Sequence, residues 1–144
     1  MRIGQLAEKT GIPVETIRYY EKEALISEPQ RTENNYRKYT RKHLEELLFI
    51  KNCRAFDMTH EEIHQMIDAM KHPSDNCHAI NAIIGEHLHH IDERIAELKI
   101  LKETLATLQS SCMSNHTIDE CTIVEGLNTM TIDAPAKGSK SHLG

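Results

Sequence analysis

The chain has 144 residues, a mass of 16.5 kDa and a formal net charge of −5, which fits one domain or one small domain with an extension. No apolar run approaches the roughly 20 residues that a membrane span requires, and the first residues lack the apolar stretch of a secretory signal. The four cysteines are expected as thiols, reactive or metal-binding, rather than as a disulfide framework. Composition therefore predicts a soluble, cytoplasmic protein and disfavours a membrane protein or a disulfide-stapled secreted domain.

Charge is distributed unevenly along the chain. Residues 1–54 hold 11 basic and 8 acidic side chains, whereas residues 55–144 hold 6 basic and 14 acidic ones. The densest basic stretch is residues 31–42, in which Tyr36 and Tyr39 are interleaved with Arg31, Arg37, Lys38, Arg41 and Lys42. Basic residues neutralise phosphates and tyrosine hydroxyls can bond to them, so this stretch is a candidate DNA contact, with a solvated loop as the alternative.

The first 23 residues fit two short helices. Apolar residues at i, i+3, i+4 spacing predict a helix over 2–9, Gly11-Ile12-Pro13 ends it, and a second helix over 14–23 follows. Two short helices joined by a tight turn that contains Gly form the helix-turn-helix pattern. The second helix would present three side chains to the major groove: Thr16, Arg18 and Tyr19.

The next segment predicts a wing and two more helices. Asn34-Asn35 suits a hairpin turn, and residues 36–39 alternate well enough for a short strand. Thr40 can cap a third helix, with a core face expected at Leu44, Leu47 and Leu48, and Cys53 on it as a structural thiol. Thr59 and Glu62 form a capping box that opens a fourth helix, ended by residues 72–75. Residues 1–75 are therefore predicted to be one winged helix-turn-helix domain.

A long helix is predicted over residues 76–111, with one apolar stripe. The stripe residues are separated by steps of three and four, as in a coiled-coil seam: Ile80, Ile84, Leu88, Ile91, Ile95, Leu98, Leu101, Leu105 and Leu108. A single long helix with one apolar stripe needs a partner, and a second copy is the simplest one; a hairpin within the monomer is the alternative. Residues 128–144 are expected to be a mobile, dispensable tail.

Three cysteines mark the ends of this helix. Cys77 begins it, Cys112 ends it, and Cys121 follows a polar loop at the start of a short helix that the Thr117–Glu120 capping pattern would open. A helix N-terminus lowers the pKa of a thiol and favours thiolate. Cys77 and Cys112 lie about 50 Å apart along the helix, so they can share a site only if two helices pair antiparallel.

The site would then span the dimer interface, twice per dimer. Three thiolates select soft ions such as cadmium, mercury, lead or zinc; three unrelated thiols are the alternative. The expected fold is mainly α: the winged domain over 1–75, an antiparallel coiled-coil dimerisation helix over 76–111, a metal-binding loop and short helix over 112–127, and the tail over 128–144.

Two histidine patterns suggest other possible sites. The run from His60 to His64 matches H-E-x-x-H, the signature of zinc hydrolases, but no third ligand and no substrate cleft are expected in so small a domain, so we predict that the protein is not an enzyme. His87 and His90 share a helix face and with Glu62 form a possible second metal site, for which a solvated polar face is the alternative. A pure interaction protein that uses only the coiled coil is a third class, disfavoured by the basic wing.

The residues quoted carry a family resemblance. Residues 1–7 (MRIGQLA), 16–21 (TIRYYE) and 35–39 (NYRKY) are similar to the MerR family of metal-responsive transcription regulators, and the resemblance covers residues 1 to about 127. Residues 49–54 (FIKNCR) and 77–87 resemble its cadmium- and lead-responsive branch (CadR and PbrR). Copper-sensing relatives tend to have serine where this chain has Cys77, which favours a divalent ion.

The resemblance implies a homodimer on palindromic double-stranded promoter DNA that represses without metal and activates when a soft divalent ion binds. Remodelled DNA then lets RNA polymerase engage both promoter elements of a metal-resistance gene. Cadmium or lead is the expected ion, with mercury or zinc as the alternatives. The family's DNA contacts fall on Thr16, Arg18, Tyr19, Tyr36 and Arg37, and its metal ligands on Cys77, Cys112 and Cys121.

Overall fold

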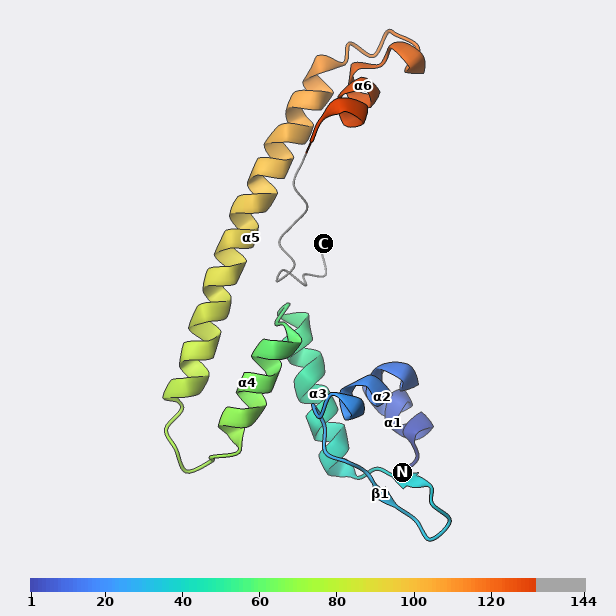
Figure 1. Ribbon diagram of the computed structural model, residues 1–144, viewed down its shortest axis with the longest axis vertical. Helices are drawn as coiled ribbons and strands as arrows, with labels where there is room; N and C mark the ends of the chain where they lie inside the picture. The colour runs from blue at the N-terminus through green and yellow to red at the C-terminus, as the bar shows by residue number, and fades with distance from the viewer. Residues whose placement is uncertain (132–144) are drawn as a thin grey trace. The chain divides into compact units, whose positions relative to one another are not determined.

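The computed structural model describes residues 1–131 (Figure 1). Six α-helices and one two-stranded sheet follow in the order α1 Ile3–Thr10, α2 Val14–Lys22, β1 Gln30–Arg31, β2 Arg37–Lys38, α3 Arg41–Ala55, α4 His60–Met70, α5 His78–Ser111, a 3₁₀ turn η1 Ile118–Glu120, and α6 Thr122–Thr129. The predicted fold class, mainly α with a winged helix-turn-helix and a long helix, is confirmed. Of the tail predicted over 128–144, residues 132–144 lie outside the described residues. Its first two residues, 128 and 129, belong to α6.

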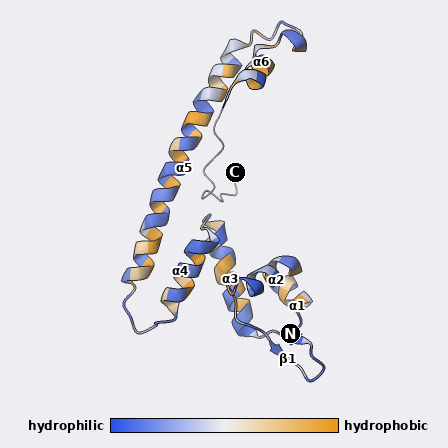
Figure 2. Ribbon diagram, in the orientation of Figure 1, coloured by the Kyte–Doolittle hydropathy of each residue, from blue (hydrophilic) through white to orange (hydrophobic). Residues whose placement is uncertain are grey.

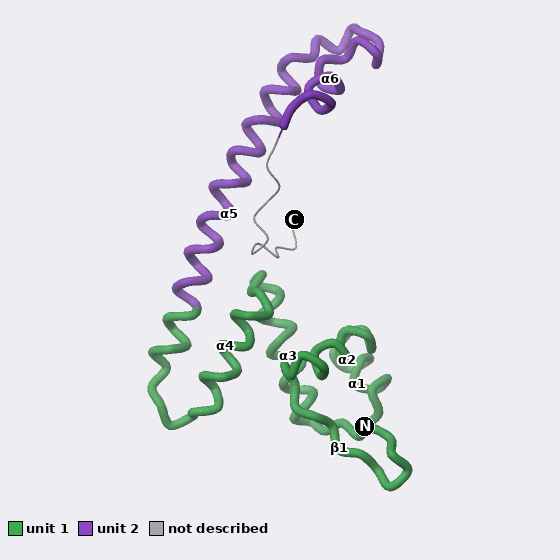
Figure 3. The backbone as a smooth tube through the Cα atoms, in the orientation of Figure 1, with its two compact units in different colours: residues 1–83, 140–144 green, residues 84–139 purple. Residues whose placement is uncertain are grey.

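The chain divides into two compact units (Figure 3). The first contains residues 1–83, from α1 to the first turns of α5, and the second begins at Ile84. These units are defined by how compactly their residues pack. The functional domain boundaries at residues 75 and 111 stay predictions. Among the described helices, none combines the length and the apolar character that crossing a membrane would take.

The core of the first unit is assembled from α1 to α4. Its fully buried side chains come from all four helices: Leu6, Ile17, Leu47, Ile50 and Ile63. Burying each such side chain contributes roughly 1.5–3 kcal/mol, so this small core holds the helix-turn-helix in place. Ile80 and Ile83 of α5 also pack against it, which ties the first turns of the long helix to this unit.

Local chemistry sets the ends of these helices as the sequence predicts. Gly11 ends α1 with φ of 71°, a left-handed conformation that suits glycine. At α4, the Thr59 hydroxyl accepts the Glu62 N–H at 3.1 Å while the Glu62 carboxylate accepts the Thr59 N–H at 2.9 Å. The predicted capping box is therefore confirmed at α4.

The core face of α3 differs from the predicted one. Leu47 is buried, but Leu48 is 40% exposed, and His43, Ile50 and Cys53 are buried instead. Leu48 lies 100° around the helix from Leu47, away from the line on which residues 43, 47 and 50 fall. Cys53 is a buried core thiol, as predicted, and burial raises its pKa.

The wing is an antiparallel hairpin in which Gln30 pairs with Lys38 and Arg31 with Arg37. Asn35 has φ of 65° in the turn, so the predicted hairpin turn is confirmed. The second strand is shorter than the predicted residues 36–39. Tyr39 leaves the sheet because its N–H donates to the carbonyl of Met1 at 2.8 Å.

The second unit consists of most of α5, η1 and α6. Helix α5 begins at His78, two residues later than predicted, and runs for 34 residues. Hydrophobic residues recur along its length (Figure 2), and the most exposed of them are Ile84, Leu88, Ile95, Ile100 and Leu105. All but Ile100 belong to the predicted stripe. Helix α6 folds back on the end of α5, where a Cβ atom at position 126 would lie 2.6 Å from Cδ2 of Leu108.

Candidate DNA-binding face and metal loop

Helix α2 separates its core side chains from its outward ones. Ile17 and Tyr20 are buried, whereas Arg18 is exposed, Tyr19 is 43% exposed and Thr16 is half-buried. The fold therefore presents the side chains that the sequence predicts for the major groove on the outer face of the second helix of a helix-turn-helix.

The wing carries three further predicted DNA contacts. Tyr36 is exposed, and the Arg2 guanidinium lies 5.1 Å from its ring centroid, a cation–π contact. Arg31 donates to the Asn35 carbonyl at 3.2 Å and so closes the turn of the hairpin. The Nε of Arg37 lies 3.2 Å from a Glu21 carboxylate oxygen at the end of α2. Arg2 and Glu21 were not singled out from the sequence, because their partners are distant along the chain.

His60 belongs to the same face. Its Nδ1 lies 3.4 Å from the Tyr19 hydroxyl, and its ring packs against the rings of Tyr19 and Tyr20, with centroids 5.5 and 5.9 Å away. No group of three clustered metal-ligating side chains in residues 1–131 includes His60 and His64. The first histidine of the H-E-x-x-H run thus lies on the outer face of the helix-turn-helix.

The predicted metal-binding loop joins the end of α5 to α6. Thr122 donates to the carbonyl of Ser111 at 2.9 Å, and the hydroxyls of these two residues lie 3.0 Å apart, so the loop is closed at its base. The Thr117–Glu120 pattern opens the short 3₁₀ helix η1, in which the Thr117 hydroxyl donates to Asp119, and α6 begins only at Thr122. Cys121 is consequently the N-cap of α6 rather than a residue of its first turn.

Cys112 and Cys121 are brought together by this closure. The backbone N–H groups of Val124 and Ile123 lower the pKa of Cys121, and the nearby Cys112 side chain adds to this effect. Both thiols are partly accessible. Two adjacent sulfurs, one of them favoured as thiolate, suit a soft metal ion. His116, in the same loop, pairs with Glu120 at 3.7 Å.

Cys77 stands apart from these two in the chain. It is exposed and directly precedes α5, whose 34 residues separate it from Cys112. The possible second site also draws on separate parts of the chain. His87 and His90 share one face of α5, with ring centroids 6.4 Å apart, but Glu62 belongs to α4 in the first unit. Both metal assignments that involve these residues stay predictions.

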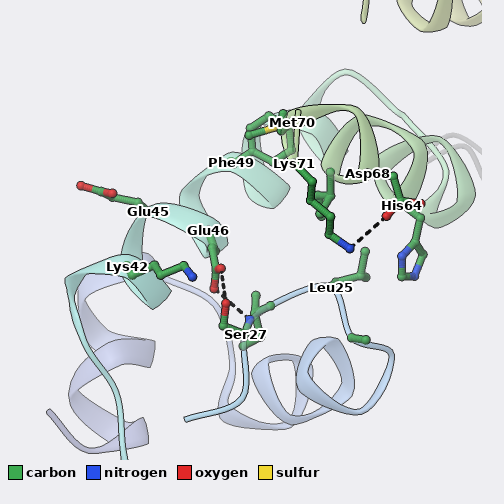
Figure 4. A pocket seen from close by; sticks show the side chains of 13 residues that line it. Leu25, Ser27, Lys42, Glu45, Glu46, Phe49, His64, Asp68, Met70 and Lys71 are labelled. Carbon is green, nitrogen blue, oxygen red and sulfur yellow. Dashed lines mark hydrogen bonds and ion pairs between the residues drawn. The ribbon is translucent and has the colours of Figure 1, made fainter. Parts of the chain in front are cut away.

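A cavity of about 590 Å³ lies in the first unit, between α3, α4 and the segment after α2 (Figure 4). Leu25, Phe49 and Ile67 supply apolar surface, and Glu46 accepts hydrogen bonds from the Ser27 N–H at 3.0 Å and hydroxyl at 2.6 Å beside it. Lys42 of the basic stretch and His64 of the H-E-x-x-H run line this cavity, whereas the DNA contacts predicted on α2 and the wing and the three cysteines predicted as metal ligands do not.

Comparison with known proteins agrees with this geometry. The family model described as MerR HTH family regulatory protein matches residues 1–70, and the model described as MerR, DNA binding matches residues 44–108. An HTH-type transcriptional regulator ZntR homolog from Haemophilus influenzae is 39% identical over 115 residues, which cover 80% of this chain and 85% of the relative.

Two solved structures are similar over most of the chain. The transcription regulator PbrR691 from Ralstonia metallidurans in complex with lead(II) is 41% identical, with a TM-score of 0.77, and the match covers 88% of this chain and 98% of that one. The dual-function regulator MerR from Bacillus megaterium in complex with mercury(II) is 32% identical, with a TM-score of 0.67, and covers 89% and 99%. These relatives are transcription regulators, which confirms the prediction that the protein is not an enzyme. The chain belongs to the MerR family of helix-turn-helix transcription regulators.

Proposed function

We propose that this protein is a homodimeric sensor of cadmium or lead that represses a promoter without metal and activates it with metal. Each of its two metal sites uses Cys112 and Cys121 of one protomer and Cys77 of its partner. The single observation that carries this proposal is the loop closed by the bonds between Ser111 and Thr122, the residues that adjoin Cys112 and Cys121, where Cys112 also contributes to the lowered pKa of Cys121.

The dimer is argued from α5. The helix has 34 residues and a length of about 50 Å, so the thiols at its two ends serve one site only if a second helix runs antiparallel to it. The exposed apolar side chains of α5 are a surface that such a partner would cover. In that arrangement Cys77 of each protomer reaches the loop of the other, which gives a three-thiolate site.

The choice of ion rests on chemistry and on the relatives. Thiolates prefer soft ions such as cadmium, lead, mercury and zinc over magnesium or calcium. PbrR691, 41% identical over nearly its whole length, was solved with lead(II), and the Bacillus megaterium MerR was solved with mercury(II) at 32% identity. The higher similarity to the lead-bound regulator favours cadmium or lead as the inducer. Mercury or zinc is the second candidate.

The proposed mechanism assigns DNA binding to the first unit and metal binding to the cysteines at the ends of α5. Side chains of α2 and the wing bind double-stranded promoter DNA in the cytoplasm. When the thiolates of both protomers close on an ion, the two DNA-binding domains shift relative to each other and deform the duplex. The energy of that deformation, rather than a new set of base contacts, changes how RNA polymerase engages the promoter.

A subunit-complementation experiment tests the shared site. Cys77→Ser and Cys112→Ser homodimers are each expected to lose metal-induced run-off transcription. A heterodimer of the two variants regains one intact site, made of Cys77 from one protomer and Cys112 and Cys121 from the other. It should bind half the wild-type amount of cadmium or lead, measured by the ultraviolet thiolate-to-metal band.

The control for this experiment is Cys53→Ala, which removes a buried thiol outside the proposed site and should retain the full metal stoichiometry. A heterodimer that binds no metal would contradict a shared site, because a site within one protomer is broken in both halves. Titrating cadmium, lead, mercury and zinc in parallel identifies the inducer by the concentration at which transcription begins.

A further inference from the structure

The wing is joined to the recognition helix by one acidic side chain. Glu21 is near the C-terminal end of α2, and its side chain is only 13% exposed. One carboxylate oxygen accepts the Tyr39 hydroxyl at 3.0 Å, and the other lies 3.2 Å from the Nε of Arg37. Glu21 therefore holds two residues at the end of the wing, 16 and 18 positions further along the chain.

Tyr39 is a fixed anchor for this contact. It is 1% exposed, its N–H donates to the Met1 carbonyl at 2.8 Å, and its own carbonyl accepts from the Met1 amino group at 2.7 Å. Burial, together with the hydrogen bond to Glu21, raises the pKa of Tyr39 to about 12. The hydroxyl thus stays protonated and able to donate to Glu21 throughout the neutral range.

The terminal nitrogens of Arg37 can bind a second partner. Its Nε faces Glu21, and a guanidinium has four further N–H donors on its two terminal nitrogens. The side chain is 42% exposed. Arg37 can therefore contact Glu21 and a DNA phosphate at the same time, with Glu21 fixing the direction in which the guanidinium points.

We propose that Glu21 is a positioning residue for DNA binding, which sets the wing relative to α2 so that Arg37 and Arg18 reach their phosphates together. This inference rests on the proposed roles of these two arginines. It predicts a change in DNA affinity opposite to the one expected from charge alone. A carboxylate beside a DNA-binding face repels phosphates, so on charge alone its removal strengthens binding. A positioning role requires the removal to weaken it.

The test compares the neutralisation of two glutamates at the C-terminal end of α2. Glu21→Gln keeps an oxygen that accepts the Tyr39 hydroxyl but loses the ion pair with Arg37. Glu23→Gln makes the same chemical change at an exposed residue two positions away. The probe is a duplex that the wild-type protein selects from a randomised pool. Glu21→Gln should weaken binding by roughly tenfold, about 1.4 kcal/mol, whereas Glu23→Gln should leave it unchanged or stronger.

Hydroxyl-radical footprinting separates positioning from a loss of fold. With Glu21→Gln, protection should fall at the backbone positions that Arg37→Ala also loses and persist at those that depend on Arg18. Tyr39→Phe keeps the buried ring and should give the same partial footprint, so it serves if Glu21→Gln does not fold. Binding by Glu21→Gln as tight as wild type, or uniform loss of protection in both variants, would overturn the proposal. If the wild-type protein selects no duplex, the DNA-binding roles themselves fail.

Discussion

Cys121 owes its chemistry to its position as the N-cap of α6. The backbone N–H groups of Val124 and Ile123, in the first turn of α6, stabilise the charged form of the thiol and so lower its pKa. Its thiolate is consequently present at lower pH than that of an ordinary cysteine. At a given pH, protons therefore compete with metal for Cys121 less than they do for a cysteine of ordinary pKa.

This argument predicts the alkylation behaviour of Cys121. The pH at which its reaction with iodoacetamide reaches half of the maximal rate should fall below the value of about 8.5 for free cysteine. Mass spectrometry of the labelled peptides measures each thiol separately. Cys53, whose pKa is raised by burial, should stay largely unlabelled in the folded protein. A profile for Cys121 at or above that of free cysteine would rule out the influence of α6.

At the scale of elements, the approach of α6 to α5 depends on Gly126. A Cβ atom added there would lie 2.6 Å from Cδ2 of Leu108, closer than van der Waals contact permits, so either Leu108 or α6 must move. The same helix is closed at its start by the bonds between Thr122 and Ser111. The position of Cys121 is therefore coupled to the packing of α6.

Gly126→Ala is expected to weaken metal binding and to bring no gain in stability, although alanine is the better helix former by about 1 kcal/mol. Gly4→Ala is the matched control, because nothing lies within 4 Å of a Cβ atom added at this helical glycine. Thermal unfolding should show a higher midpoint for Gly4→Ala than for Gly126→Ala. Equal gains from both would mean that α6 does not need the close approach.

At the scale of the whole molecule, the proposed dimer depends on one face of α5. Leu88 and Leu105 belong to the stripe and are exposed in the single chain, whereas Ile100 is equally exposed but lies off the stripe. An apolar stripe is stable in water only when it is covered. The assembly should therefore respond to changes on the stripe and not to changes beside it.

Leu88→Glu and Leu105→Glu should each shift the protein from dimer toward monomer by placing a charge in the seam. Sedimentation velocity measures this shift directly. Ile100→Glu adds the same charge to the same helix and should leave the dimer intact. If all three variants behave alike, the helices do not pair through the stripe, and a cysteine site shared between protomers has no geometric basis.

Much of this protein follows from the sequence because it depends on contacts a few residues apart. Short spacings encode the helix-turn-helix, the turn at Asn35 and the capping box of Thr59 with Glu62. The predicted start of the last α-helix is too early: Thr117 bonds to Asp119 and opens a 3₁₀ helix, because the same side chain can satisfy several local geometries.

Only the tertiary structure decided the contacts between distant residues. It revealed the bonds of Glu21 to Tyr39 and Arg37, and the contact of His60 with Tyr19, 41 positions away. It also turned Leu48 outward and closed the loop between Cys112 and Cys121 through the bonds of Ser111 with Thr122. The physical reason is that such pairs form only after the helices have packed around a shared core. The spacing of residues within a single segment does not determine how the helices pack against one another.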